Sequence, residues 1–501
     1  MDRLARQPFI LTLMGIGAIA MFLPAIHAYH VRDLHEARSF FYSGALLMVF
    51  VTLVCIAVAS GRRRRRAAGL LLSLVATLIV LPPILAMPFY EALGDVSWIE
   101  CWFEMVSALT TTGATMFPDP GGLPDSLHLW RGLVAWLGGL LFWIGAVAIL
   151  APLNLGGFEV VTIDQLSARR SVLRERGSGD AVERLHRYTV RLTPIYVGLT
   201  LTLWTLLVLV GHEPLDGAIL AMSTLSTSGI TAGTVTEGPF AAEFVIAIFL
   251  VFALSRLTFQ TDGIVRRPGY MFRDPEIRLS LFLILAVTAF LFLRHWVGAF
   301  EEEDQEDLAA AGRALWGTIF TTISFLTTTG FESAAFVHAR DWSGLQTTGL
   351  VLMGLALVGG GVATTAGGVK LLRIYALYKH GRREMERLVH PSSIGGSGAV
   401  GRRLRREGAF VAWIFFMLFA ISLAVIMAAL TLAGQDFEES LILTISALST
   451  TGPVAEVAGE VPIRFADLST SAQVITALAM ILGRLETLAF IALFNRGFWH
   501  S

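Results

Sequence analysis

Ser324-Phe325-Leu326-Thr327-Thr328-Thr329-Gly330-Phe331 is one of four related octets in this chain. The others are SALTTTGA at 107–114, STLSTSGI at 223–230 and SALSTTGP at 446–453. Aligned on the glycine, all four have serine six positions earlier and leucine four positions earlier. Serine or threonine fills the three positions between, and the middle one is always threonine. Agreement at six positions in four places indicates one structural unit used four times.

The composition predicts a membrane protein. Of 501 residues, 54% are hydrophobic and only 15% are charged, which is unlike an ordinary soluble protein. The apolar residues occur in runs of about 20, the length that crosses roughly 30 Å of hydrocarbon. The two cysteines, Cys55 and Cys101, lie in apolar surroundings and indicate neither a disulfide framework nor a metal site. The first run follows Arg3 and Arg6 but lacks a convincing cleavage site, so we expect a retained helix.

Ten membrane spans are expected from the apolar runs. They cover 8–29, 40–60, 67–89, 127–152, 190–211, 242–264, 279–298, 345–378, 408–433 and 471–494. From about residue 65 the order is span, short segment ending in an octet, span, and this order occurs four times. The first two spans form an additional hairpin.

The basic residues predict the orientation of the spans, because lysine and arginine concentrate in cytoplasmic loops. Arg62–Arg66 is an unbroken basic run, and the segments 165–191, 266–278 and 379–406 are also rich in arginine. All four lie on one side if every span crosses once, together with both termini. The acidic run Glu301–Asp307 lies on the opposite side. We therefore expect both termini in the cytoplasm and the octets entering from outside. A topogenic role explains the arginine run better than nucleic-acid binding.

Each octet ends a short apolar helix. The expected helices are Trp98–Thr110, Leu215–Ser226, Arg313–Thr327 and Glu438–Ser449. A half-helix entering from outside directs the partial negative charge of its C-terminus toward the middle of the bilayer. A glycine directly after it permits backbone conformations closed to other residues, so that successive carbonyls can face one axis. Carbonyl rings of this kind replace the hydration shell of potassium. The alternative is serine and threonine contacts between helices with a glycine C-cap; the fourfold occurrence favours a filter.

The four octets in this arrangement resemble those of the TrkH/KtrB superfamily of potassium transporters. Trp136–Pro152 resembles the first inner helix of that family, Gly359–Lys370 its intramembrane loop and Gly483–Glu486 its fourth inner helix. The resemblance covers nearly the whole chain, and ten spans resemble TrkH rather than the shorter KtrB. It implies K+ uptake across the inner membrane, a homodimer, and control by a cytoplasmic nucleotide-binding subunit of the TrkA/KtrA type. The octets at 223–230 and 446–453 depart from the family pattern after the glycine, which bears on strict K+ selectivity.

The fold class is accordingly an all-α polytopic membrane protein with four tandem helix–pore-helix–helix repeats around a pseudo-tetrameric pore. The expected domains are a hairpin at 1–64 and repeats at 65–160, 161–265, 266–400 and 401–501. The expected K+ filter residues are Thr111, Thr112, Gly113, Thr227, Ser228, Gly229, Thr328, Thr329, Gly330, Thr450, Thr451 and Gly452.

A glycine-rich stretch interrupts the eighth span and is expected to form a gate. Its gate residues are Gly359, Gly360, Gly361, Thr364, Thr365, Gly367, Gly368 and Lys370, joined by Arg484 from the last span. Such a stretch is a poor helix former and, at membrane depth, must line the pore or be buried in protein. Small-residue packing of the GxxxG kind is the alternative. Arg484 is expected to face the pore as an electrostatic barrier or to pair with a carboxylate of another helix. Lys370 is a weaker candidate, nearer the cytoplasmic end.

No nucleotide-binding motif, nucleophile elbow, carboxylate pair or metal-ligand cluster indicates an enzyme, and no cofactor other than the transported K+ is expected. Two alternatives to potassium uptake remain. One is a Na+-permeable or Na+/H+-coupled transporter of the same fold, although all four filter positions carry glycine rather than the serine associated with sodium passage. The other is a membrane scaffold that does not transport.

Overall fold

The computed structural model describes residues 8–58, 67–117, 119–151, 181–233, 240–255, 274–299, 308–337, 349–390 and 399–485. All regular structure in these residues is helical. Several sequence features lie outside them: Arg62–Arg66, most of the basic segments 165–191 and 266–278, the acidic run 301–307 and Glu486. The expected domain limits after residues 64, 160 and 265 also lie there.

Ten apolar helices correspond one to one to the ten expected spans within the described ranges. Seven are long enough to cross a membrane: Phe9–Val31, Leu34–Val58, Gly69–Leu93, Asp125–Leu150, Val182–Val210, Pro275–Arg294 and Phe410–Leu432. Three are shorter: Phe240–Ala253, Gly349–Val358 and Thr470–Leu485. The first of these three was expected to continue to residue 264 but ends in a 3-10 turn, η8 (Val251–Ala253).

The four short helices are α5 (Trp98–Leu109), α9 (Pro214–Ser226), α13 (Leu308–Leu326) and α18 (Phe437–Ser449). With 12 or 13 residues, α5, α9 and α18 are about 18–20 Å long, too short to cross a bilayer. The start of α5 is fixed by a capping box between Ser97 and Glu100. Pro214 occupies the first turn of α9, where its missing N–H is not needed.

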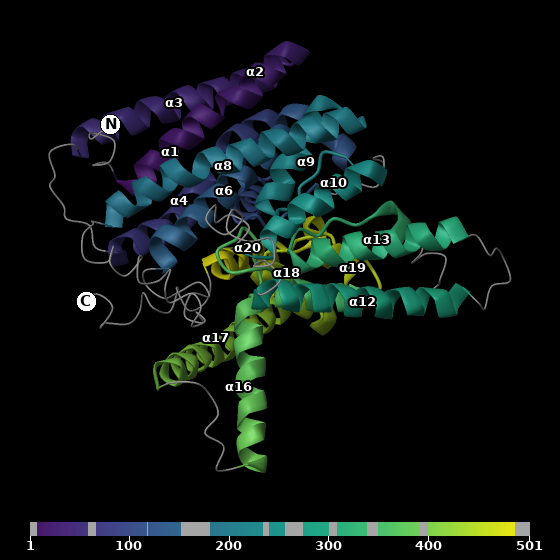
Figure 1. The fold of residues 1–501 in the computed structure, drawn as a ribbon. Coiled ribbons are helices and arrows are strands. Elements are labelled where there is room, and N and C mark those ends of the chain that lie inside the picture. Colours follow the sequence, from purple (N-terminus) through teal and green to yellow (C-terminus); the bar gives the residue numbers. More distant parts are fainter. Residues whose placement is uncertain are drawn as a thin grey trace.

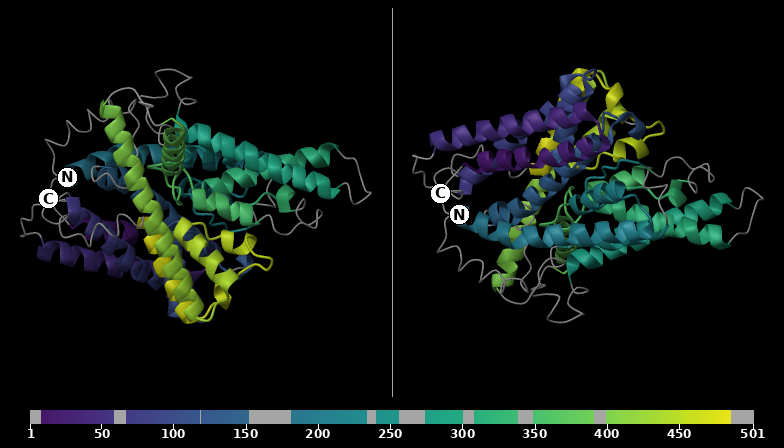
Figure 2. Two further views of the ribbon diagram at one scale, coloured as in Figure 1. Left: turned by 90° about the horizontal axis from the view of Figure 1, so that it is seen from below. Right: turned by 90° about the horizontal axis from the view of Figure 1, so that it is seen from above.

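In each repeat, the inner helix is the one that follows the octet. It packs against the short helix of the next repeat. The pairs are α6 (Asp125–Gly145) with α9, α10 (Phe240–Leu250) with α13, α15 (Gly349–Val358) with α18, and α20 (Thr470–Leu485) with α5. The last pair brings the end of the described chain back to the first repeat and closes the ring. Figure 2 accordingly shows the yellow C-terminal helices beside the purple and blue N-terminal ones.

Two further parts lie outside this ring. The hairpin of α1 (Phe9–Ala20), α2 (Phe22–Val31) and α3 (Leu34–Val58) packs on α4 (Ala67–Leu93) and α6. Helix α16 (Leu371–Val389) extends well away from the body and meets α17 (Ala399–Leu432) near its base (Figure 1). The remaining long helices are α8 (Ala181–Val210) and α12 (Pro275–Ala299).

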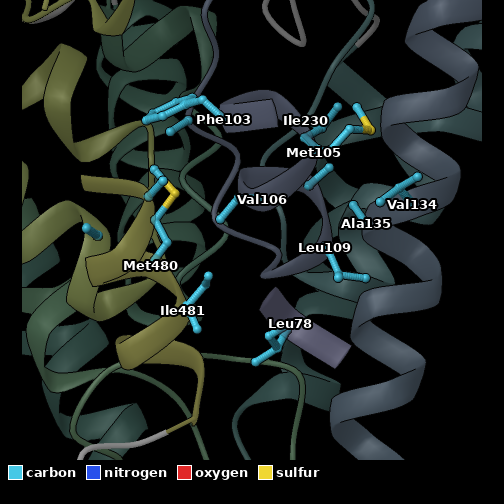
Figure 3. Close-up of a cluster of buried hydrophobic side chains, with 14 of the residues drawn as sticks. Leu78, Phe103, Met105, Val106, Leu109, Val134, Ala135, Ile230, Met480 and Ile481 are labelled. Atoms are coloured by element: carbon cyan, nitrogen blue, oxygen red, sulfur yellow. The ribbon is translucent and has the colours of Figure 1, made fainter. Parts of the chain in front are cut away.

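Helix α5 is surrounded by apolar side chains from three helices and another octet. Figure 3 shows Phe103, Met105, Val106 and Leu109 of α5 among Leu78 of α4, Val134 of α6, Ile481 of α20 and Ile230 of the second octet. All eight are buried. The packing fixes this short helix from all sides and thereby fixes the position of the octet at its end.

Candidate functional site

The four glycines of the octets form a ring in which each lies directly against the next octet, three against its backbone and Gly330 against the Pro453 ring. A methyl group placed on Gly113 would lie 1.8 Å from the carbonyl oxygen of Ser228, and one on Gly229 would lie 2.3 Å from that of Thr329. One on Gly330 would lie 2.7 Å from the Pro453 ring, and one on Gly452 would lie 2.2 Å from the nitrogen of Ala114. The contacts run through octets one, two, three and four and return to one, so a side chain would separate neighbouring octets.

The middle threonine of every octet adopts a left-handed backbone conformation. Its φ is 55° at Thr111, 53° at Thr227, 58° at Thr328 and 54° at Thr450. Left-handed helix ends normally use glycine, and a β-branched residue there is strained by about 1–3 kcal/mol. Each threonine N–H donates to the carbonyl three residues earlier, and the next N–H donates to the carbonyl five residues earlier. The helix ends thus hold the same strained conformation four times.

In the first three octets the backbone alternates in handedness. Thr111 and Gly113 have φ of 55° and 73°, whereas Thr112 between them does not have a positive φ. The same alternation occurs at 227–229 and 328–330. Because this alternation turns successive N–H groups to one side, it turns the carbonyl oxygens to the other. Three octets therefore have the backbone needed for a row of carbonyls facing one axis.

The first and third hydroxyls of each octet are joined to each other. The distances between hydroxyl oxygens are 2.8 Å for Thr110 and Thr112, 3.1 Å for Ser226 and Ser228, 3.1 Å for Thr327 and Thr329, and 3.3 Å for Ser449 and Thr451. The first hydroxyl also donates to the preceding helical turn. These bonds explain why serine or threonine fills these positions.

The fourth octet differs from the other three. Gly452 lacks a positive φ, and its N–H donates a 2.6 Å hydrogen bond to the carbonyl of Thr112. The Ser446 hydroxyl donates to the carbonyls of Thr451 and Gly452, at 3.1 and 3.3 Å. These two carbonyls thus point toward their own helix. The glycine of this octet precedes Pro453, which restricts its backbone conformation.

The expected gate is an irregular loop between α15 and α16, as the sequence predicted, and it turns back on itself. The N–H groups of Val369 and Lys370 donate to Leu357 and Val358 across its base. There, Gly359 and Gly368 cross so closely that a methyl group on Gly359 would lie 2.7 Å from the other Cα. Gly360 and Gly361 pack on the backbone of residues 253–255 at the end of η8. The five-glycine composition is therefore required by backbone contacts on both sides.

The second half of this loop, residues 364–368, touches the third and fourth octets. The Gly367 N–H donates a 2.7 Å hydrogen bond to the Thr328 hydroxyl. A methyl group on Gly367 would lie 2.1 Å from the carbonyl oxygen of Ser449 and 2.2 Å from the Thr450 hydroxyl. Thr364 and Thr365 are buried beside it. The loop and the octets therefore form one continuous site.

Arg484 is bonded to the loop. Its Nη1 donates a 2.7 Å hydrogen bond to the carbonyl of Thr365, and its guanidinium lies 4.6 Å from the centre of the Phe142 ring. The alternative expectation for Arg484, an ion pair with a carboxylate of another helix, stays a prediction. Lys370 is buried within the loop, where its Nζ donates to the carbonyl of Ala366.

Three further anchors were not predicted from the sequence. The buried carboxylate of Glu276 in α12 accepts a 2.8 Å hydrogen bond from the N–H of Val362. Arg373 in α16 lies 3.6 Å above the Phe415 ring of α17. A five-residue π-helical turn, η3 (Ala146–Leu150), packs Ala146 and Val147 against Val362 and Ala363. Charged residues flanking apolar runs are the only sequence signal for the first two.

Comparison with known proteins agrees with this architecture. Residues 36–498 match the family described as TrkH, cation transport protein. The chain belongs to the TrkH family. It is thus an all-helical, multi-pass membrane protein of a transport family and not an enzyme, as the sequence predicted.

Relatives within the TrkH family align over the whole chain. The Trk system potassium uptake protein TrkH of Vibrio parahaemolyticus is 28% identical over 504 residues, covering 98% of both chains. TrkI of Halomonas elongata, also a Trk system potassium uptake protein, is 27% identical and aligns over 100% of this chain and 98% of its own. The crystal structure of the potassium transporter TrkH from V. parahaemolyticus superposes with a TM-score of 0.79 at 25% identity, covering 98% of each chain.

Proposed function

We propose that this protein takes up K+ across the bacterial inner membrane through the ring of four octets. The observation that carries the proposal is the repeated strained turn, in which threonine is left-handed in all four octets and glycine in three of them. Strain of this kind persists where the surroundings enforce it and concentrates at functional sites. Carbonyl oxygens arranged around an axis would replace the water of a desolvated K+. The relatives named as potassium uptake proteins support the choice of ion.

The filter in this proposal consists of the twelve residues expected from the sequence, three from each octet. The proposal includes the expected limits of the four repeats and of the N-terminal hairpin. The orientation, with both termini in the cytoplasm, continues to depend on the basic residues. A half-helix entering from outside then ends at the filter, with its C-terminal carbonyls toward the ion.

We also propose that the loop from Gly359 to Gly368 gates the pore. Contact between Gly367 and the octets of repeats three and four supports a blocking position directly beneath the filter. Arg484 and Lys370 hold the loop in place through the carbonyls of Thr365 and Ala366. A homodimer and a cytoplasmic nucleotide-binding subunit of the TrkA/KtrA type complete the proposal. The projecting helix α16 offers such a subunit a surface directly connected to the loop.

The test is rescue of a bacterium that lacks potassium uptake, combined with Rb+ and Na+ flux in liposomes containing the purified chain. We expect growth at low K+ and Rb+ flux well above Na+ flux. Equal Rb+ and Na+ fluxes would contradict K+ selectivity. Absence of flux, with and without the regulatory subunit, would favour the scaffold instead.

The second candidate is a Na+-permeable transporter, and the fourth octet is the observation that favours it. Two of its carbonyls accept hydrogen bonds from Ser446, which leaves fewer for a dehydrated ion. Glycine at all four filter positions favours K+. The Na+ arm of the liposome experiment decides between the two candidates.

A further inference from the structure

Glu104 and Arg131 form a buried ion pair directly behind the first octet. Oε1 of Glu104 lies 2.6 Å from Nε of Arg131, and the side chains are 1% and 4% exposed. Glu104 belongs to α5 and Arg131 to α6. Charged pairs at this depth lose their hydration and need well-placed partners, so their other contacts show what the pair holds.

Both side chains bind the segment that leaves the octet. Oε2 of Glu104 accepts a 2.8 Å hydrogen bond from the N–H of Met116 and a 3.3 Å bond from the Thr115 hydroxyl. Nη2 of Arg131 donates a 2.8 Å bond to the same hydroxyl, and its Nη1 lies 3.4 Å from Nδ1 of His128. Because Glu104 precedes the octet by three residues and Thr115 follows it directly, the pair closes the octet from both ends.

A related brace, without an arginine, occurs in the third repeat. Thr321 aligns with Glu104, nine residues before the octet glycine, and Ser333 aligns with Met116, three residues after it. The Thr321 hydroxyl accepts a 3.3 Å hydrogen bond from the N–H of Ser333. The buried carboxylate of Glu243 also contacts Ser333 and Ala334 and accepts a bond from Trp316.

The second and fourth repeats have no polar group at the corresponding position. Their residues are Leu220 and Leu443, both buried, opposite Ala232 and Ala455. Since contacts between the octets run in the order one, two, three, four, the braced octets lie across the ring from each other. A brace from this position of the short helix to the residue three positions after the octet glycine therefore occurs in two opposite octets, one and three.

We infer that Glu104 and Arg131 are positioning residues for ion selection. By fixing Thr115 and Met116, they hold the carbonyls of the first octet at the spacing that favours K+ over the smaller Na+. This inference rests on the proposed function. The pair contributes little to overall stability, because an apolar pair of similar volume in place of a buried ion pair is often neutral or stabilising.

The test is the double variant Glu104→Leu/Arg131→Met, which leaves no unpaired buried charge and introduces the leucine of repeats two and four. In liposomes we expect Rb+ flux to persist and the Rb+/Na+ flux ratio to fall by about tenfold, equivalent to about 1.4 kcal/mol of discrimination. The midpoint of thermal unfolding is expected to stay within a few degrees of the parent value. The control is Glu183→Leu/Arg187→Met, the same replacement at an exposed ion pair on α8, with an unchanged ratio.

Hydrogen exchange provides a readout that does not depend on transport. Amides of 110–117 are expected to exchange faster in the double variant, and those of 226–233 are expected to keep the parent rate. An unchanged flux ratio, or unchanged exchange at 110–117, would overturn the inference. If the parent protein carries neither ion, the proposed function fails on its own, and the exchange experiment still decides whether the pair holds the octet.

Discussion

The Gly367 N–H donates a 2.7 Å hydrogen bond to the hydroxyl of Thr328, which joins the intramembrane loop to the third octet. Both groups are buried. Thr328 is also the residue whose φ of 58° sets the strained turn. One side chain therefore belongs to the expected filter and, at the same time, holds the expected gate.

Replacing Thr328 by valine is expected to increase ion flux. Valine keeps the shape and β-branching of threonine but leaves the buried N–H of Gly367 without an acceptor, at a cost of about 1–3 kcal/mol. The lost bond destabilises the loop in the position seen here. Rb+ flux without a regulatory subunit should therefore rise severalfold. The matched control is Thr111→Val, because the Thr111 hydroxyl has no hydrogen-bond partner among the described residues. Equal fluxes in the two variants would contradict a holding role for Thr328.

Replacing Glu276 by glutamine or leucine separates the effect of charge from that of hydrogen bonding. Glu276 holds the first half of the loop, whereas Thr328 holds the second half. Glutamine can still accept the 2.8 Å bond from the N–H of Val362, whereas leucine cannot. We expect Glu276→Leu to raise basal Rb+ flux and Glu276→Gln to remain close to the parent. A parent-like flux for the leucine variant would show that the loop does not depend on this bond.

Arg484→Gln tests the second half of the loop, which Arg484 holds through the carbonyl of Thr365. It removes the 2.7 Å hydrogen bond to Thr365 and the contact with the Phe142 ring, so basal flux is expected to rise. Because the two anchors hold different parts of the loop, their effects on the free energy of opening should add when Arg484→Gln and Glu276→Leu are combined. Liposome flux of both single variants and the double variant checks this; a double variant no faster than Arg484→Gln alone would refute independent anchoring.

Ser446→Ala is expected to improve K+ binding at the fourth octet. The substitution removes the hydroxyl that donates to the carbonyls of Thr451 and Gly452, which frees both oxygens for the ion. The apparent Km for Rb+ uptake should fall severalfold. Ser107→Ala is the control, since the Ser107 hydroxyl has no hydrogen-bond partner in the described part of the chain. A higher Km for Ser446→Ala would mean that these bonds support the filter.

Thr111→Gly is expected to increase stability and reduce selectivity. Glycine adopts φ near 55° without the roughly 1–2 kcal/mol that other residues require, although its greater freedom when unfolded offsets about 0.5–1 kcal/mol. The net gain is therefore between about 0 and 1.5 kcal/mol. A more flexible turn should discriminate less between Rb+ and Na+. Thermal unfolding and the flux ratio measure the two effects, and a destabilised variant would contradict strain at this threonine.

Much of the fold was predictable from the sequence because it depends on length and hydropathy. All ten spans and all four helices that end in an octet were predicted, although α13 begins at Leu308 and not at Arg313 as expected. The fourfold octet predicted the ring of turns. The broken eighth span was predictable because five glycines in ten residues disfavour a helix. The end of α10 at Leu250, well before residue 264, was not predictable, since the apolar pattern continues beyond it.

The partners of charged residues could not be predicted. Arg484 bonds to a carbonyl 119 residues away, and any backbone position offers the same acceptor. Glu104 and Arg131 were visible as charges in apolar surroundings, but their pairing depends on the packing of α5 against α6. The different fourth octet was partly indicated by Pro453, whereas the bonds from Ser446 depend on the conformation that this proline imposes.

The intramembrane loop has consequences for how such a pore can be assembled. Its contacts come from every repeat: η3 of the first, η8 of the second, Glu276 and Thr328 of the third, and Ser449 and Arg484 of the fourth. A tetramer of identical subunits would carry four copies of this loop, and the close contacts of Gly367 leave room for one. Fusion of the four repeats into a single polypeptide removes that conflict, because each quarter can then diverge while the turns stay alike. A single copy of the loop thus requires four non-identical quarters, and one continuous polypeptide supplies them.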